Sequence, residues 1–579
     1  MKKSYTFNHN PLLSERVPIW RARFVLICLL MGFTLLFGRA VFLQGVNNEF
    51  LQQKGESRYA RTLTMPANRG KVTDRHGEPL AISTPVKSIA AITDLAQLNA
   101  AQVALLAKAL EMPSGEVARR LASKRDFVFL KREVSPDEAQ RITSMNLPGI
   151  QAQEEFRRYY PVGEVASHVI GFTNVDDKGQ EGIELALESE LVGKPGSRRV
   201  IRNRRGEVVE DVESIRNPQD GRDIPLALDA KIQYLAYSAL KQAVRANKAK
   251  AGAVVVLDAR TGEILALVNS PTFNPNNRVR LSGDQIRNRV FTDSYEPGST
   301  MKPFVAAMAL ESHRFKPDSL IDINNGRLVI DGAAISDSHG GHASMTLTQV
   351  IQKSSNIGSA KLALSFPAEH MWNLYDALGF GQPLRLGFPG EVGGRLRPYR
   401  NWRQIEQATM SYGHGVSVTL MQLAHAYMVF ARDGELLPLS LTRLESPPLH
   451  GKRVFSPEVA KQVRTMLETV VGEGGTAPKA AVPGYRVGGK TGTAYKLEGG
   501  RYTRKYISSF VGVAPISDPR IVVAVMVDEP GGDQHYGGDV AAPVFSQITG
   551  ATLRWMGVRP DATIVPTQVA RLGKVKEDM

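Results

Sequence analysis

The sequence predicts an α+β protein with one N-terminal membrane-spanning helix and two folded regions outside the membrane. Four observations support this prediction. An apolar run lies close to the N-terminus, and hairpins of strands open and close the larger region with helices between them. The chain has 579 residues, which is more than one ordinary domain. Apolar residues make up 42% and charged residues 22%, so both regions can bury a core.

The apolar run extends from Phe24 to Leu43, and its roughly 20 residues are enough for one helical crossing of a bilayer. The residues before it are rich in lysine and arginine, which predicts a cytoplasmic tail over 1–23. Residues 24–43 would then be the membrane anchor, and the rest of the chain would lie outside the cytoplasm. A cleaved signal peptide is the main alternative. It requires small residues at a cut site, and Gly38-Arg39-Ala40 is a poor site. A buried soluble helix would show a polar face, which this run lacks.

The exported part divides into a first region over 58–225, a larger region over 226–560 and a loose polar tail over 561–579. In the first region, Ala101 to Leu110 predicts a helix. Arg198 to Val209 alternates as strands do, with Arg205-Gly206 as a turn candidate. The turn formers from Asn217 to Gly221 mark the boundary between the two regions.

The larger region is predicted to contain one sheet built from both of its ends. Two strand segments, 253–258 and 263–268, flank a turn and form an antiparallel hairpin, and 509–515 and 521–527 repeat the pattern. Helices lie between these hairpins. One follows Ser299, and another runs from Ser456 to Val471, where Ser456 can cap it and Pro457 suits its first position.

Charge and cysteine content exclude several functions. The formal net charge of +15 is spread along the chain. Its densest cluster lacks the aromatic residues of a base-stacking surface, so we expect no nucleic acid partner; the cluster consists of Arg198, Arg199, Arg202, Arg204 and Arg205. The single cysteine, Cys28, lies in the anchor, and no metal-binding spacing of histidines is present. We therefore expect neither a metal nor another cofactor.

The first candidate for chemistry is Ser299 with Lys302. The turn Pro297-Gly298 precedes Ser299 and an apolar helical run follows, so Ser299 is placed at a helix N-terminus. Residues three apart share a helix face, so the lysine can act as the base that a serine nucleophile needs. The helix dipole, burial and a second cation would each lower the pKa of this lysine. The spacing alone is weak, because a helix cap shows it too.

Two further motifs follow in the same region. In Ser354-Ser355-Asn356, the hydroxyl of Ser354 can relay a proton and the amide of Asn356 can bind a substrate carbonyl. In Lys490-Thr491-Gly492-Thr493, an edge strand is expected to pair with an extended peptide, and Gly492 lets that peptide approach closely. Lys490 with the hydroxyls of Thr491 and Thr493 would hold a terminal carboxylate. Each motif alone is weak, but the three in this order are specific.

Together these motifs resemble those of the penicilloyl serine transferases, and the chain is similar to class B penicillin-binding proteins over nearly its whole length. Arg69 to Gly77 resembles the first motif of the class B pedestal, although His76 stands where asparagine is commoner. Arg158 to Pro161 and Gly179 to Glu184 resemble later pedestal motifs. The stretch from Ser411 to Gln422 resembles the septal, FtsI-type branch rather than the elongation branch.

The resemblance implies a pedestal (dimerisation-type) domain and a penicillin-binding transpeptidase domain with the serine β-lactamase-like fold. It implies an inner-membrane peptidoglycan D,D-transpeptidase at the division septum, with its catalytic domain in the periplasm. Ser299 would attack the penultimate D-alanine of a pentapeptide stem with Lys302 as base, and the N–H groups of Ser299 and Thr493 would form the oxyanion hole. Ser354 and Lys490 would relay the proton, and β-lactams would acylate Ser299. An FtsW-type glycosyltransferase and other divisome membrane proteins are the implied partners.

Two alternatives remain open from the residues alone. The same scaffold supports a D,D-carboxypeptidase or a β-lactamase, although the large first region and the lack of a Glu-x-x-Leu-Asn segment argue against a β-lactamase. A non-catalytic scaffold or β-lactam sensor would keep the site only for binding. The motif residues are all present, which argues against a site that has lost its catalytic function.

Overall fold

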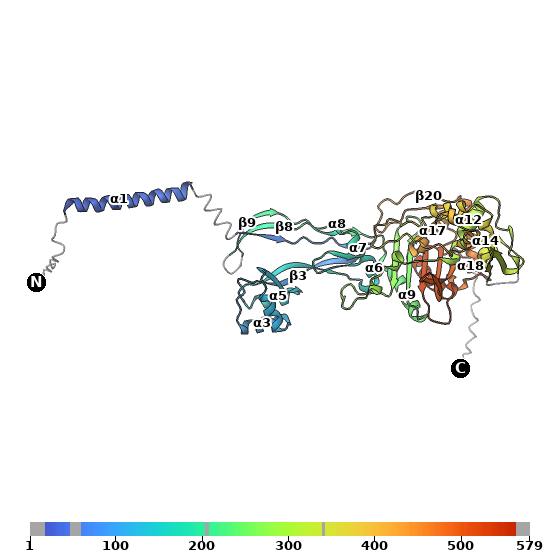
Figure 1. The fold of residues 1–579 in the computed structure, drawn as a ribbon, viewed down its shortest axis with the longest axis horizontal. Helices are drawn as coiled ribbons and strands as arrows, with labels where there is room; N and C mark the ends of the chain where they lie inside the picture. The colour runs from blue at the N-terminus through green and yellow to red at the C-terminus, as the bar shows by residue number, and fades with distance from the viewer. Residues whose placement is uncertain (1–17, 47–59, 203–207, 338–341, 563–579) are drawn as a thin grey trace, which may run out of the picture. The chain divides into compact units, whose positions relative to one another are not determined.

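The computed structural model describes residues 18–46, 60–202, 208–337 and 342–562. The chain forms two compact units (Figure 1). Unit 1 comprises Met1–Pro66, Lys87–Glu154 and Pro195–Gln219, and unit 2 comprises Ala67–Val86, Glu155–Lys194 and Asp220–Met579. Segments of the predicted first region therefore occur in both units, and the domain limits given above remain predictions. Residues 1–17 and 563–579 of the two predicted tails lie outside the described residues.

Helix α1 (Ile19–Val41) confirms the predicted apolar helix and begins five residues before it, and a π-helical turn (Phe42–Val46) follows. The candidate membrane span is Ile19–Gly45, with 27 residues and a mean hydropathy of 2.2. At about 1.5 Å per residue this length exceeds the ~30 Å hydrocarbon core of a bilayer. None of its most apolar stretch is buried against the rest of the protein, so its apolar side chains are available to lipid.

Unit 1 contains an antiparallel sheet and a small helical core. The sheet has the order β1 (Ala60–Met65), β8 (Gly196–Arg202) and β9 (Val208–Arg216). Strands β8 and β9 confirm the strand pattern predicted from Arg198 onward. Arg204 and the turn candidate Arg205-Gly206 lie outside the described residues. Helices α3 (Ala100–Leu110), α4 (Ser114–Leu121) and α5 (Pro136–Thr143) bury Leu106 and Ile142 against β4 (Phe127–Val134). Helix α3 begins one residue before the predicted helix and is capped by Asn99.

The part of unit 2 that comes from the predicted first region is organised around three buried charges. Arg69 Nε donates to Glu184 Oε2 at 2.6 Å, and Arg158 Nε donates to Glu184 Oε1 at 2.7 Å. All three side chains are buried. The remaining donors reach backbone oxygens, including that of Gly70, and the side chains of Glu188 and Ser83. Buried charges are tolerated only when paired and hydrogen-bonded, so this triad fixes the segments that carry it.

The larger part of unit 2 contains a five-stranded antiparallel sheet built from both ends of the region, as predicted. Its order is β12 (Ile264–Ser270), β11 (Ala251–Asp258), β23 (Ile521–Asp528), β22 (Arg501–Ala514) and β21 (Gly488–Glu498). Both expected hairpins form, β11 with β12 and β22 with β23. Strand β21 pairs only with β22 among the described strands, and the turn Gly298–Met301, which precedes α12 (Lys302–Glu311), lies against it.

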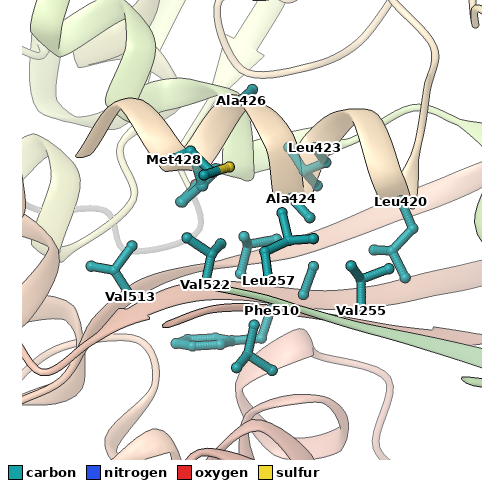
Figure 2. Close-up of a cluster of buried hydrophobic side chains, with 14 of the residues drawn as sticks. Val255, Leu257, Leu420, Leu423, Ala424, Ala426, Met428, Phe510, Val513 and Val522 are labelled. Carbon is teal, nitrogen blue, oxygen red and sulfur yellow. The ribbon is translucent and has the colours of Figure 1, made fainter. Parts of the chain in front are cut away.

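Helices cover both faces of this sheet. Helix α17 (Leu420–Ala431) places Leu423, Ala424 and Met428 over the apolar side chains of one face, as Figure 2 shows. On the opposite face Phe510 meets Phe545 of α20 (Ala542–Trp555), with their ring centroids 4.7 Å apart. Helix α9 (Ala230–Ala246) packs beside α20. The sheet is therefore a rigid support for the residues at its β21 edge.

Two helices carry residues of the motifs, α12 and α14 (Asn356–Leu364). A third, α18 (Pro457–Val471), packs against α12 and β21. Ser456 accepts a hydrogen bond from the N–H of Val459 and Pro457 is the first residue of α18, which confirms the predicted start of that helix.

Candidate active site

Ser299 lies in a short 3₁₀ turn, Gly298–Met301, that leads directly into α12. Gly298 has φ +59°, a conformation that favours glycine, and it lets the chain reverse before the serine. The turn is tied down by Thr300, whose hydroxyl donates to Pro297 O at 2.8 Å and whose carbonyl accepts from Tyr427 at 2.7 Å. The predicted turn and helix are thus confirmed, and Ser299 itself is only partly buried.

Lys302 is buried, with 1% of its surface exposed, and its Nζ points at the second motif. Nζ lies 2.5 Å from Ser354 O, 3.1 Å from Ser354 Oγ and 2.8 Å from Asn356 Oδ1. Within the described part of the chain these are the hydrogen bonds of the ammonium group, and Ser299 is not among its partners. The structure therefore brings the first two motifs together through the lysine.

The two buried lysines of the site have lowered pKa values. Burial lowers the pKa of Lys302 well below its usual value, the charge of Lys490 lowers it further, and Asp337 opposes the shift. Burial also lowers the pKa of Lys490 to about 7. This agrees with the expectation that burial and a second cation act on Lys302. A lysine with a lowered pKa is neutral more often and can accept a proton from a serine hydroxyl.

The second motif is held by Asp337, a residue that sequence reasoning missed. One oxygen of Asp337 accepts from Ser355 Oγ at 2.5 Å, and the other accepts from the N–H groups of Asn356 and Ile357 at 2.6 and 3.1 Å. Ser355 also caps α14. Ser354 adopts φ +61°, a strained conformation for a residue with a side chain, which this anchoring can maintain. Asp337 lies 18 residues before Ser355, and no local pattern marks that pairing.

The third motif lies on the edge strand β21, as predicted. Lys490 is fully buried, and its Nζ lies 3.2 Å from Thr491 Oγ1. Thr493 Oγ1 accepts from the N–H of Gly537 at 3.0 Å. A Cβ on Gly492 would lie 2.3 Å from Ser509 Oγ and 2.8 Å from Pro297 O. Gly492 therefore permits the close approach of the Ser299 turn to β21, a task that the sequence did not predict.

A loop over residues 412–415 completes the site and was also missed as part of it. The Tyr412 ring lies 6.0 Å from Lys302 Nζ. Gly298 N donates to Gly413 O at 3.3 Å, and Gly415 N donates to Glu296 Oε1 at 2.8 Å. These two hydrogen bonds fix the loop against the segment that carries Ser299. The sequence had used this stretch only for its family resemblance.

The three motifs thus converge around one site, and comparison with known proteins identifies the architecture that carries them. Residues 252–550 match the model of the penicillin binding protein transpeptidase domain. Residues 64–226 match that of the penicillin-binding protein dimerisation domain. The chain belongs to the class B penicillin-binding proteins.

Relatives of this class B penicillin-binding protein match almost end to end. It is 43% identical over 555 residues to the probable peptidoglycan D,D-transpeptidase PenA of Neisseria gonorrhoeae, covering 95% of each chain. It is 41% identical over 551 residues to the peptidoglycan D,D-transpeptidase FtsI of Escherichia coli K12, covering 94% of this chain and 93% of that one. The transpeptidase domain of Burkholderia pseudomallei penicillin-binding protein 3 is 54% identical, with a TM-score of 0.54, and covers 58% of this chain and 98% of that one.

These comparisons confirm the predicted family, fold class and type of enzyme. The protein is a peptidoglycan D,D-transpeptidase of the FtsI type, with a penicillin-binding domain that takes peptidoglycan stems and β-lactams. Together with α1, the relationship makes it a membrane-anchored protein.

Proposed function

We propose that Ser299 is the residue that becomes acylated and that Lys302 is its general base. The observation that carries this proposal is the position of Lys302. It lies one helical turn after Ser299, and its buried Nζ is hydrogen-bonded to Ser354 and Asn356. Burial and the charge of Lys490 lower the pKa of this lysine well below its usual value, which favours the neutral amine that a general base requires. Lys302 takes the hydroxyl proton as Ser299 Oγ attacks the carbonyl of the penultimate D-alanine.

The remaining residues receive roles that their positions support. The bond to the terminal D-alanine breaks, and its amine leaves with a proton relayed by Ser354 and Lys490. The N–H groups of Ser299 and Thr493 stabilise the oxyanion, because the Ser299 turn lies against β21: a Cβ on Gly298 would lie 3.5 Å from Thr493 O. The terminal carboxylate is held by Lys490, Thr491 and Thr493, and Gly492 lies between the two threonines. The side chain of Asn356 orients the stem. An amine of a second stem then attacks the acyl-serine and forms the cross-link.

The setting is part of the same proposal. The N-terminus lies in the cytoplasm, α1 crosses the inner membrane and the catalytic unit works in the periplasm at the division septum. An excess of lysine and arginine before the apolar helix supports this orientation. Since we find no sequence pattern of a glycan polymerase, an FtsW-type glycosyltransferase supplies the glycan strands. That enzyme and other divisome membrane proteins are the proposed partners.

Labelling by a fluorescent penicillin tests the acyl-serine step. The full chain in detergent should form a covalent fluorescent adduct that survives denaturation. Ser299→Ala should abolish it, and Ser546→Ala, which removes a hydroxyl outside the site, should leave it intact. An unlabelled wild-type protein, or a labelled Ser299→Ala variant, would remove Ser299 from this role.

A further inference from the structure

His414 lies beside the turn that carries Ser299, and no step of the proposed acylation involves it. The residue before it, Gly413, accepts a hydrogen bond from the N–H of Gly298 at 3.3 Å, and Gly298 immediately precedes the serine. The His414 side chain is 28% exposed, so a substrate group can reach it. The imidazole is therefore held close to the nucleophile without being sealed from solvent.

The aromatic neighbours of His414 place it at the edge of the catalytic centre. Its ring centroid lies 5.5 Å from that of Tyr412 and 6.2 Å from that of Tyr502. The Tyr412 ring in turn lies 6.0 Å from Lys302 Nζ. One aromatic ring thus separates the imidazole from the proposed base of the acylation step.

A carboxylate determines which nitrogen of His414 can accept a proton. His414 Nδ1 lies 3.3 Å from Glu296 Oε2. Glu296 also accepts hydrogen bonds from Gly415 N at 2.8 Å and from the Tyr502 hydroxyl at 3.0 Å. Burial raises the pKa of Glu296, but its hydrogen bonds with His414 and Gly415 bring the pKa below its usual value, so the carboxylate is ionised. An ionised carboxylate beside Nδ1 favours the tautomer with hydrogen on Nδ1, which leaves the lone pair on Nε2.

The other titratable groups around His414 keep their charge state near neutral pH. Burial raises the pKa of Tyr412 and of Tyr502 to about 12, so both hydroxyls stay protonated. Arg397, close to the same loop, pairs with Glu406 at 2.8 Å. Within the described part of the chain, His414 Nε2 has no hydrogen-bond partner. Because histidine ordinarily changes charge between pH 5 and 8, this nitrogen is available as a proton acceptor.

The second half of the reaction requires a proton acceptor. A primary amine such as that of a lysine side chain has an ordinary pKa of about 10.4, so roughly one molecule in 2,500 is neutral at pH 7. Only the neutral amine has the lone pair that attacks an acyl-serine. Burial and the charges of lysines in the site disfavour the ammonium form of an amine that enters it, and the proton then needs a group that receives it.

We propose that Nε2 of His414 takes a proton from the ammonium group of the acceptor stem, with Glu296 orienting the imidazole. The freed amine attacks the carbonyl carbon of acyl-Ser299, so that a C–N bond forms and the bond from that carbon to Ser299 Oγ breaks. A second proton of the nitrogen passes to Ser299 Oγ through Lys302, and His414 gives its proton to water. The inference rests on the proposed acylation of Ser299 and adds the residue that prepares the acceptor.

The partition of one acyl-enzyme between amine and water tests this role. The full chain in detergent receives a pentapeptide stem with blocked amines as donor and a tetrapeptide stem with a free side-chain amine as acceptor. Cross-linked and hydrolysed products are quantified. Because both products come from the same acyl-enzyme, their ratio is independent of the rate of acylation.

His414→Gln keeps a polar side chain beside Glu296 but cannot take the proton. At pH 7 it should lower the ratio of cross-linked to hydrolysed product by about tenfold. This is less than the ~10²–10⁴-fold of a general base in a closed site, because water reaches the imidazole. At pH 9.5 about one amine in ten is already neutral, and the ratio should lie within about threefold of the wild type.

The rate of labelling by fluorescent penicillin separates this role from a structural one. His414→Gln should be labelled within about threefold of the wild-type rate, because acylation involves no acceptor. His450→Gln is the matched control. It removes another histidine beside a carboxylate, with Nδ1 3.8 Å from Glu435 and 84% of the side chain exposed, and should keep the wild-type ratio.

Several outcomes would overturn the inference. They are an unchanged ratio in His414→Gln, a loss of equal size at pH 7 and pH 9.5, and a fall in labelling as large as the fall in transfer. A wild type that is labelled but forms no cross-link would also overturn it and leave the acyl-serine proposal standing. A wild type that is never labelled would end both proposals.

Discussion

Gly413 supports the turn that carries Ser299, and a single methyl group there should displace the nucleophile. A Cβ on Gly413 would lie 2.2 Å from Gly298 O and 2.5 Å from Gly298 N, where ordinary contact begins at 3.4 Å. Gly413→Ala therefore forces the two segments apart by about 1 Å, and a misplacement of this size costs about 10²-fold in rate, or about 2.7 kcal/mol. The positive φ of +85° adds a strain of about 1–2 kcal/mol to the folded state.

Gly415 provides a matched control in the same loop. It has the same φ of +85°, but its nearest neighbour for a Cβ is Met410 Cε at 3.5 Å, an ordinary contact. Gly415→Ala should therefore lose the same ~1–2 kcal/mol of stability and keep the rate of acylation within about threefold. Rates of acylation by fluorescent penicillin and denaturant midpoints of both variants give the comparison. If the two variants acylate equally fast, the contact between Gly413 and Gly298 does not position Ser299.

Three more predictions concern the lysines and the buried charges. Lys302→Ala should fold but acylate about 10²–10⁴-fold more slowly, as measured by stopped-flow labelling, and an unchanged rate would exclude it as the base. The acylation rate should fall as the pH is lowered and Lys302 gains its proton. It should also fall as the pH rises above about 7, because Lys490 then loses the charge that holds the stem carboxylate; a rate that rises steadily through pH 9 would contradict the role of Lys490. Arg158→Ala leaves buried Glu184 without one of its partners and should lower the free energy of unfolding by about 3–5 kcal/mol, and a loss below about 1 kcal/mol in denaturant would show that the triad is dispensable.

Local patterns were sufficient to predict the elements that local chemistry determines. The cap at Ser456 with Pro457, the hairpin of β11 with β12 and the turn before Ser299 each depend on residues close in sequence, and the structure contains all three. The edge position of β21 followed from its place next to the last hairpin. The residue types in the three motifs then indicated which side chains to expect in one pocket.

Contacts between distant segments were beyond such patterns. Asp337 supports the second motif from 18 residues away, and Glu296 meets a backbone N–H 119 residues later in the chain. Gly492 was expected to accommodate substrate, but the space beside it is occupied by Pro297 O and Ser509 Oγ. Each of these depends on how turns pack after folding, and a carboxylate or glycine in the sequence gives no sign of its distant partner.

The central claim is that Ser299 carries the acyl group, and the most direct measurement is to locate that group on the chain. The full-length protein is treated with benzylpenicillin, digested, and its peptides are analysed by mass spectrometry. The account predicts one penicilloyl adduct, on Ser299, that is absent from Ser299→Ala. An adduct on Ser354 or on another residue, with Ser299 unmodified, would contradict it.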